Sequence, residues 1–408
     1  MELVERHLTS WARELLDATP VLVIEGARQV GKSTLAAMLS PESAVLTTMD
    51  DELTRTFASD DPAGFLASAG DRRLVVDEIQ RCPELILPLK AAVDRDRTPG
   101  RFILTGSANL LRLPGAEDSL AGRAMTIRVH PFTQGELAGH RDDWVTALTS
   151  GPMPATVAPE RDEVIDRITR GGYPPVQTLS GRVRTAWLDD YADRLLERDS
   201  ADLGPTQLPV LRNLLRIITA APGGEIVWER LADALGVARA TVSRHLDILE
   251  GLFLVERLPS WSRNLTNRQV GRTKAYVSDT GLAAALSRLA PEHLRAPHGA
   301  DHLGPLLENF VVIELLRQQG WSSTPYTLSH YRDRNGAEVD VIIETPRGVI
   351  GVEVKSTSTA RSDHFKHLIS LRERLGPEFV AGVVLSLGSS RTVGDRLHAL
   401  PVSSLWDH

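Results

Sequence analysis

The sequence predicts an α/β protein built from several units, and three observations lead to this prediction. A glycine-rich segment, 26–34, lies between an apolar run, 21–24, and a run with helical spacing, 35–39. A second apolar run, 74–76, is followed directly by two acids, Asp77 and Glu78. The chain has 408 residues, and single cores stop growing at roughly 250–300 residues. Strand, loop and helix in that order form the unit of a parallel sheet, and the length leaves room for further domains.

Residues 26–34 have the G-x-x-x-x-G-K-[ST] spacing of a Walker A phosphate loop. Two glycines let the backbone turn its N–H groups toward phosphate oxygens, beside a helix N-terminus that favours anions. Lys32 is expected to reach the β- and γ-phosphates, and Ser33 to bind Mg²⁺. The expected nucleotide-binding residues of the loop are Gly26, Ala27, Arg28, Gln29, Val30, Gly31, Lys32, Ser33 and Thr34. ATP and Mg²⁺ are therefore the expected cofactors.

Residues 73–78 predict a buried strand that ends in two carboxylates, which is a Walker B pattern. Asp77 is expected to hold the Mg²⁺ shell, and Glu78 to orient or deprotonate the attacking water. An apolar strand that ends in acids is common by itself. Downstream of a Walker A motif it is a strong indication of a hydrolytic nucleotide site.

Two further strands carry candidate residues of this site. Strand 101–106 ends in small polar groups, and Ser107 or Asn109 is the candidate sensor of the γ-phosphate, with a capped loop as the alternative. Arg123 precedes strand 125–129 and is a candidate finger on the γ-phosphate of its own or a neighbouring subunit. The second role would require a homo-oligomer, and a surface salt bridge is the alternative.

Short strands that alternate with helices predict a parallel sheet covered on both faces, with the ligand at the carboxyl ends of the strands. The extra strand 44–48 between the two motifs favours the AAA+-like branch of P-loop proteins.

Composition excludes several classes of protein. No apolar run reaches the roughly 18 residues of a membrane helix, and the first residues lack a signal-peptide pattern. A cytoplasmic protein without a membrane partner is therefore expected. Cys82 is the only cysteine, so no intramolecular disulfide and no cysteine-based zinc site is expected. The net charge of −7 argues against a strongly basic nucleic-acid binder, although 206–280 has ten basic against seven acidic residues.

The motifs together resemble the prokaryotic AAA+-like ATPases that carry a C-terminal DUF4143 domain. The resemblance rests on the segments 26–34, 76–80, 105–109, 120–123, 131–132, 171–174 and 197–199. It extends over nearly the whole chain and implies an ATPase fold with a modular layout.

The middle of the chain predicts two smaller units. The proline-rich segment 151–159 predicts the end of an ATPase domain at 1–150, followed by a helical lid or connector at 151–205. Residues 206–280 have a helix-turn-helix pattern around Gly236 and predict a winged helix. The residues expected to contact DNA are Arg239, Thr241, Ser243, Arg244, His245, Arg263, Arg268, Arg272 and Lys274. The alternative is a module that only packs against the ATPase or another subunit.

The last domain, 281–408, is expected to have a restriction-endonuclease-like α/β fold, because 305–386 predict the order α-β-β-β-α-β. If the hairpin turns at 345–348, Asp340 lies opposite Glu353. Lys355 then lies on the same face, by the two-residue period of a strand.

Two opposed carboxylates beside a lysine are typical of metal-dependent phosphodiester cleavage. Asp340 and Glu353 are expected to share Mg²⁺ (or Mn²⁺), Glu308 to complete the metal shell, and Lys355 to position or activate the water. The pattern resembles the PD-(D/E)xK nuclease superfamily, with Val339 in place of the usual proline. The alternative is an inert nuclease-like fold.

The leading hypothesis is an ATP-hydrolysing protein that couples its nucleotide state to DNA binding and to DNA cleavage by the C-terminal domain. The alternative is a nucleotide-switched DNA-binding or protein-interaction factor, such as a regulator or toxin–antitoxin component, with an inert nuclease-like domain. A ring-forming remodelling ATPase that acts on protein is a third hypothesis.

Overall fold

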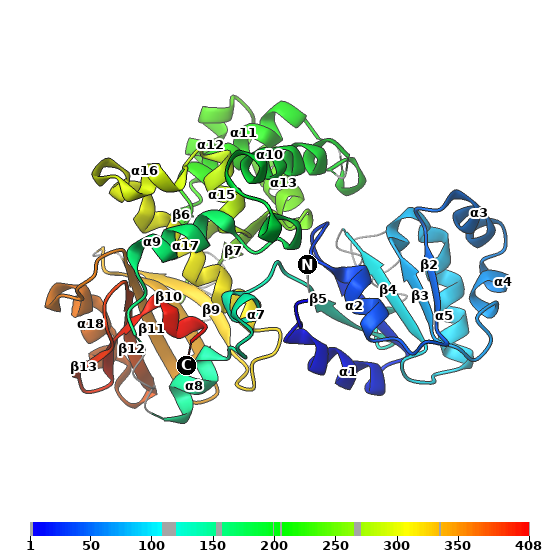
Figure 1. Cartoon of the computed structure of the whole chain (residues 1–408), viewed down its shortest axis with the longest axis horizontal. Coiled ribbons are helices and arrows are strands. Elements are labelled where there is room, and N and C mark those ends of the chain that lie inside the picture. The colour runs from blue at the N-terminus through cyan, green and yellow to red at the C-terminus, as the bar shows by residue number, and fades with distance from the viewer. Residues whose placement is uncertain are drawn as a thin grey trace.

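The computed structural model describes residues 3–107, 120–151, 157–198, 200–204, 206–264, 271–333 and 336–407. Figure 1 shows two large parts: an N-terminal sheet with its helices, and a second part in which helices cover a larger C-terminal sheet. Within the described ranges, no helix combines the length and the hydropathy needed to cross a bilayer.

The N-terminal sheet has five strands in the order β2-β3-β4-β1-β5, and every described pair in it is parallel. Its strands are β1 (Val21–Glu25), β2 (Val45–Thr48), β3 (Leu74–Asp77), β4 (Phe102–Gly106) and β5 (Ala124–Arg128). The helices of this part are α1 (Leu8–Ala18), α2 (Lys32–Met38), α3 (Glu52–Asp60), α4 (Pro62–Ala67) and α5 (Ile86–Arg95). The first four residues of β1 are fully buried, as expected for a strand covered on both faces. The prediction of a parallel α/β nucleotide domain is confirmed.

After β5 the chain leaves this sheet and crosses to the second part (Figure 1). There it forms α7 (Gln134–Ala138) and α8 (Trp144–Ser150). The indole N–H of Trp144 donates to Ser404 Oγ, 3.2 Å away. The boundary expected at residue 150 therefore does not coincide with the end of the first sheet, because α7 and α8 belong to the packing of the C-terminal part.

The middle of the chain is mostly helical, with a small antiparallel sheet of order β6-β8-β7. Its helices are α9 (Arg161–Arg170), α10 (Gly181–Arg198), α11 (Leu208–Ala220), α12 (Trp228–Leu235), α13 (Arg239–Gly251), α15 (Thr280–Leu286) and α16 (Pro291–Arg295). Its strands are β6 (Gly224–Glu225), β7 (Val255–Leu258) and β8 (Lys274–Val277). Gly236 follows α12 with φ of 65°, a left-handed conformation that suits glycine. The helix-turn-helix pattern thus has its helices in place, and the winged-helix assignment stays a prediction.

The C-terminal sheet has the order β13-β14-β12-β11-β10-β9. Its strands are β9 (Thr327–Arg332), β10 (Glu338–Thr345), β11 (Gly348–Lys355), β12 (Phe379–Ser386), β13 (Arg391–Gly394) and β14 (Leu397–Pro401), with α18 (Lys366–Leu375) after β11. In the antiparallel β10–β11 pair Val341 lies opposite Val352, so the hairpin has the predicted register. The last two strands were not expected.

One helix, α17 (Ala300–Gln318), packs against β11 of this sheet and carries Pro305 inside it. The prediction that the helix begins at Pro305 was wrong. A proline removes one backbone hydrogen bond and is unfavourable inside a helix, but α17 is buried along most of its length, and this packing holds the helix together on both sides of the proline.

Candidate functional site

The phosphate loop connects β1 to α2 and has the backbone of a tight turn. Gly26 has φ of 149°, and a Cβ atom placed there would lie 2.2 Å from the carbonyl oxygen of Val129. Gly31 caps α2 with φ of 97°. The buried ammonium of Lys32 donates to the carbonyl oxygen of Ala27, 2.9 Å away. Lys32 therefore lies across the loop, where phosphate oxygens would compete for its three N–H donors.

Asp77 is positioned by two hydroxyl groups at the carboxyl end of β3. Ser33 Oγ donates to Asp77 Oδ1 at 2.9 Å, and Thr105 Oγ1 donates to the same oxygen. A hydroxyl and a carboxylate are the oxygen ligands that Mg²⁺ prefers. Ser33 and Asp77 thus fit a nucleotide-bound Mg²⁺. The sequence interpretation missed Thr105, although it lies one residue before the end of β4.

Glu78 lies beside this pair with an unusual backbone, φ 56° and ψ 43°. Left-handed conformations are uncommon for residues with a side chain and gather at functional sites. Ser107 Oγ donates to Glu78 Oε2 at 3.2 Å. The amide of Gln80 donates to the same carboxylate oxygen and to Ser107 Oγ, the latter at 2.9 Å.

These contacts place the candidate sensor Ser107 against the candidate catalytic acid. Gln80 was not singled out from the sequence, and the signal was its position two residues after Glu78 in the resembling segment 76–80. The other candidate sensor, Asn109, lies outside the described residues.

Arg123 lies at the wrong edge of the sheet for a finger on its own nucleotide. The residue after it, Ala124, pairs with Val21 at the start of β1, whereas the phosphate loop follows the other end of β1. Its guanidinium forms two hydrogen bonds to Asp94, at 2.7 and 2.9 Å. The finger role within one subunit is therefore wrong, and the alternative of a surface salt bridge describes Arg123.

A contact that the sequence did not suggest joins the helical connector to the phosphate loop. The hydroxyl of Tyr191, on α10, donates to the carbonyl oxygen of Arg28 at 2.9 Å. The Tyr191 ring stacks on Trp187, with centroids 5.0 Å apart and planes 11° apart. Tyr191 therefore connects α10 directly to the backbone of the phosphate loop.

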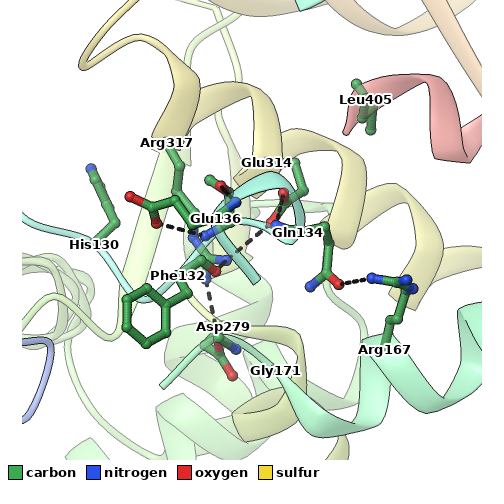
Figure 2. A network of polar contacts seen from close by, with 12 residues as sticks. His130, Phe132, Gln134, Glu136, Arg167, Gly171, Asp279, Glu314, Arg317 and Leu405 are labelled. Carbon is green, nitrogen blue, oxygen red and sulfur yellow. Dashed lines mark hydrogen bonds and ion pairs between the residues drawn. The ribbon is translucent and has the colours of Figure 1, made fainter. Parts of the chain in front are cut away.

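Figure 2 shows a buried polar network where the segment after β5 meets α17 and the start of α15. Arg317 is 3% exposed. Its guanidinium donates to the carbonyl oxygen of Phe132 at 2.8 Å, to Glu314 Oε1 at 3.1 Å and to Asp279 Oδ2 at 3.2 Å. Glu314 also accepts from the backbone N–H of Gln134 at 2.8 Å. Burial raises the pKa of Glu314 to about 8, against the opposing effects of Arg317 and this N–H.

Two glycines of the segment 171–174 complete this junction. The N–H of Gly172 donates to Asp279 Oδ2 at 2.7 Å, and its carbonyl accepts from the N–H of Phe132 at 2.8 Å. A Cβ atom on Gly171 would lie 2.1 Å from Asp279 Oδ1, and one on Gly172 would lie 2.2 Å from the Phe132 carbonyl oxygen. Segments 131–132 and 171–174, two of those that carried the family resemblance, therefore meet at an interdomain junction and not at the nucleotide.

The residues expected to contact DNA are scattered, and two of them are buried. His245 bonds the N–H of Gln207 and the carbonyl of Thr241, and it has no exposed surface. Lys274 is 3% exposed and points into the C-terminal part. The prediction that these two residues contact DNA is therefore wrong. The helical packing encloses the His245 side chain, and an ion pair holds the Lys274 side chain.

The other expected DNA contacts lie on or near the surface. Arg239 and Arg244 are exposed on α13, together with the half-buried Thr241 and Ser243. Arg239 pairs with Glu229, Arg263 with Glu378 and Arg272 with Glu225. Arg268 lies outside the described residues.

The C-terminal carboxylates gather as the hairpin predicted. Asp340 Oδ2 accepts from the N–H of Val354 at 2.8 Å, and Lys355 Nζ lies 2.8 Å from Glu353 Oε1. Glu308, from α17, accepts from the hydroxyl of Tyr276 at 2.7 Å. Burial, and then the charge of Asp340, raise the pKa of both Glu308 and Glu353 to about 7.

The expected metal set of Asp340, Glu353 and Glu308 does not fit a metal in this arrangement. In the part of the chain that the structure describes, no three His, Cys, Asp or Glu residues are grouped so that they could hold an ion. The physical reason is Lys274, whose ammonium lies 3.0 Å from Glu308 Oε1 and 4.0 Å from Asp340 Oδ1. A lysine stands among the carboxylates where the sequence predicted Mg²⁺.

The fold and the first site define a P-loop NTPase of the AAA type. The family model described as "AAA domain" matches residues 18–138, "Domain of unknown function (DUF8612)" matches 161–293, and "Domain of unknown function (DUF4143)" matches 303–405. Uncharacterized proteins of Mycobacterium bovis and Mycobacterium tuberculosis are each 32% identical over 368 residues, covering 88% of this chain and 75% of theirs. The chain belongs to their family, and in this chain the AAA domain precedes the DUF4143 domain.

More distant similarities are also found. A Haemophilus influenzae protein is 22% identical over 312 residues, covering 72% of this chain and 69% of its own. AMPPCP-bound DnaA from Aquifex aeolicus matches with a TM-score of 0.29 and 13% identity, over 60% of this chain and 86% of that one. A RuvB variant from Thermotoga maritima matches with a TM-score of 0.26 and 19% identity, over 65% and 89%.

Proposed function

We propose that the chain hydrolyses ATP with Mg²⁺ at the loop 26–34. The observation that carries the proposal is the meeting of Ser33, Asp77, Glu78 and Ser107 at the carboxyl ends of β1, β3 and β4. This edge of a parallel sheet is where ligands of α/β proteins bind.

Each residue has a role set by its position. The loop N–H groups and Lys32 hold the phosphates, and Lys32 exchanges the Ala27 carbonyl for phosphate oxygens when nucleotide binds. Ser33 and Asp77 would hold Mg²⁺, which neutralises developing charge on the phosphate oxygens. Glu78 orients the attacking water and accepts its proton. Ser107 and Gln80 donate hydrogen bonds that hold the Glu78 carboxylate. A change around that carboxylate would reach both side chains through these bonds.

The proposal includes a partner: DNA, contacted by the exposed residues of α13. Arg244 is exposed, and it lies with Thr241 and Ser243 on the second helix of the helix-turn-helix pair. This is the helix that enters the major groove in proteins with this motif. The Tyr191 contact and the Arg317 junction would link the ATPase to these helices and to the C-terminal domain. DNA cleavage is not part of the proposal, because Lys274 lies within the carboxylate cluster.

The experiment is a measurement of phosphate release from ATP with Mg²⁺, with EDTA, and with or without duplex DNA. Wild type is expected to turn over ATP only with Mg²⁺, and Lys32→Ala to lose turnover, since Lys32 is the side chain whose ammonium lies across the loop. Lys366→Ala, a change at an exposed lysine, is the matched control. Turnover retained in Lys32→Ala would contradict the hydrolytic site. If DNA does not change the turnover and the protein does not retain a labelled duplex, the proposal of DNA as a partner is contradicted, whereas the proposal of ATP hydrolysis is not.

A further inference from the structure

The C-terminal carboxylate cluster contains a cation supplied by a different part of the chain. Glu308, Glu338, Asp340 and Glu353 come from α17, β10 and β11, whereas Lys274 comes from β8 of the small middle sheet. Lys274 Nζ lies 2.8 Å from Glu338 Oε1 and 3.0 Å from Glu308 Oε1. Lys274 thus extends from the middle sheet into the cluster, beside Tyr276 of the same strand, whose hydroxyl donates to Glu308 Oε1 at 2.7 Å.

The burial of this lysine is costly without its partners. An ammonium group removed from water loses several kcal/mol of favourable hydration free energy, unless nearby charges and hydrogen bonds offset that loss. Lysine is also scarce here, at five of 46 basic residues. A lysine ammonium is a compact point charge, whereas the arginine guanidinium is a wide planar fork. The position between two carboxylates therefore suits the less common of the two side chains.

The cluster has cation-binding capacity beyond what Lys274 and Lys355 satisfy. Four carboxylates face two ammonium groups and one guanidinium, that of Arg332, which lies 3.9 Å from Glu338 Oε2. Glu353 Oε2 is buried with no hydrogen-bond partner. Such an oxygen lacks the stabilisation that a donor or a cation would provide. An all-oxygen set of this kind would suit Mg²⁺ or Mn²⁺ if the ammonium were absent.

We propose that Lys274 is the resident cation of this cluster: it latches β8 to β10 and α17 and closes the carboxylates to divalent metal ions. A divalent ion binds the cluster only when Lys274 is removed from it. This proposal is independent of ATP hydrolysis and accounts for the mismatch between the predicted metal set and the structure.

The test is a calorimetric titration of the full chain with Mn²⁺, without nucleotide, for wild type, Lys274→Met and Lys274→Met/Asp340→Asn. Methionine keeps the length of the lysine stem and removes its charge. The expected result is Mn²⁺ binding tighter than wild type by about a hundredfold or more, because a unit charge within about 4 Å is lost. The Asp340→Asn change should abolish the gain. Lys366→Met, which removes an exposed lysine, is the matched control and should titrate like wild type.

Two results would overturn the proposal. One is wild-type Mn²⁺ binding as tight as that of Lys274→Met and abolished by Asp340→Asn. The other is a Lys274→Met protein that is folded, judged by circular dichroism, and that binds no more Mn²⁺ than wild type. If Lys274→Met fails to fold, the double variant Lys274→Met/Glu308→Gln takes its place in the titration, because it removes one charge of each sign. The double variant should still bind Mn²⁺ more tightly than wild type, and binding equal to that of wild type would overturn the proposal.

Discussion

Glu78→Gln is expected to lower the turnover of ATP by about 100-fold or more while ATP still binds, because a general base contributes about 10²–10⁴-fold to such reactions. The amide keeps an oxygen that can accept from Ser107 and Gln80, so the hydrogen bonds around it are expected to persist. Glu78 lies outside the loop 26–34 that we propose to hold the phosphates, so ATP binding is expected to persist. Phosphate release and the affinity for a fluorescent ATP analogue are the measurements.

Glu84→Gln is the matched control for this change, because Glu84 is an exposed acid six positions further along the chain. Its turnover should equal that of wild type. Glu78→Gln with unchanged turnover would remove the role of Glu78. A joint loss of ATP affinity and turnover would indicate that Glu78 supports the site structurally.

Arg317→Met is expected to lower the free energy of unfolding by about 3–5 kcal/mol, the typical cost of removing one partner of a buried ion pair. The change leaves Asp279 and Glu314 buried without their cation, and it also removes donors to the carbonyl oxygens of Phe132 and Ser278. Three segments of the chain would lose contact at the same point. Chemical denaturation followed by circular dichroism measures the difference.

The comparison for this prediction is Arg13→Met, which removes an exposed arginine on α1. Changes at such surface positions alter stability by about 0.5 kcal/mol or less. If Arg317→Met is as stable as Arg13→Met, the junction contributes no net stability, and its role in holding the two parts together is contradicted.

The nucleotide site was predictable because its chemistry is local in sequence. The Walker A spacing places Gly26, Lys32 and Ser33 within eight residues, and an acid at the end of a buried strand must reach the same sheet edge. The hairpin register also followed from the two-residue period and the turn at 345–348. Thr105 was missed because its contact with Asp77 depends on which strands are neighbours, and that order is not a local property. Gln80 was missed although it lies only two residues after Glu78.

The predictions that failed involve pairs distant in sequence. Arg123 was considered as a finger because it precedes strand 125–129, but Ala124 pairs with Val21 in the parallel β1–β5 pair, so Arg123 lies at the amino ends of these strands and the loop follows the carboxyl end of β1. Lys274 was assigned to DNA because it follows a run of basic residues, whereas its partners Glu308 and Glu338 lie on elements beyond the middle sheet. No pattern within 206–280 carries that information. The junction around Arg317 could not be predicted from the sequence for the same reason, since Phe132, Gly172 and Asp279 come from three separate segments.

We expect the nucleotide state to reach the C-terminal half through Tyr191 and the Arg317 junction. Hydrogen exchange of Glu78→Gln, with and without ATP, measures this coupling, because this variant is expected to hold ATP without hydrolysing it. Slower exchange is expected with ATP in α10 around Tyr191 and in the junction segments 131–138 and 310–318, as well as in the phosphate loop. Changes confined to residues 20–107 would contradict it.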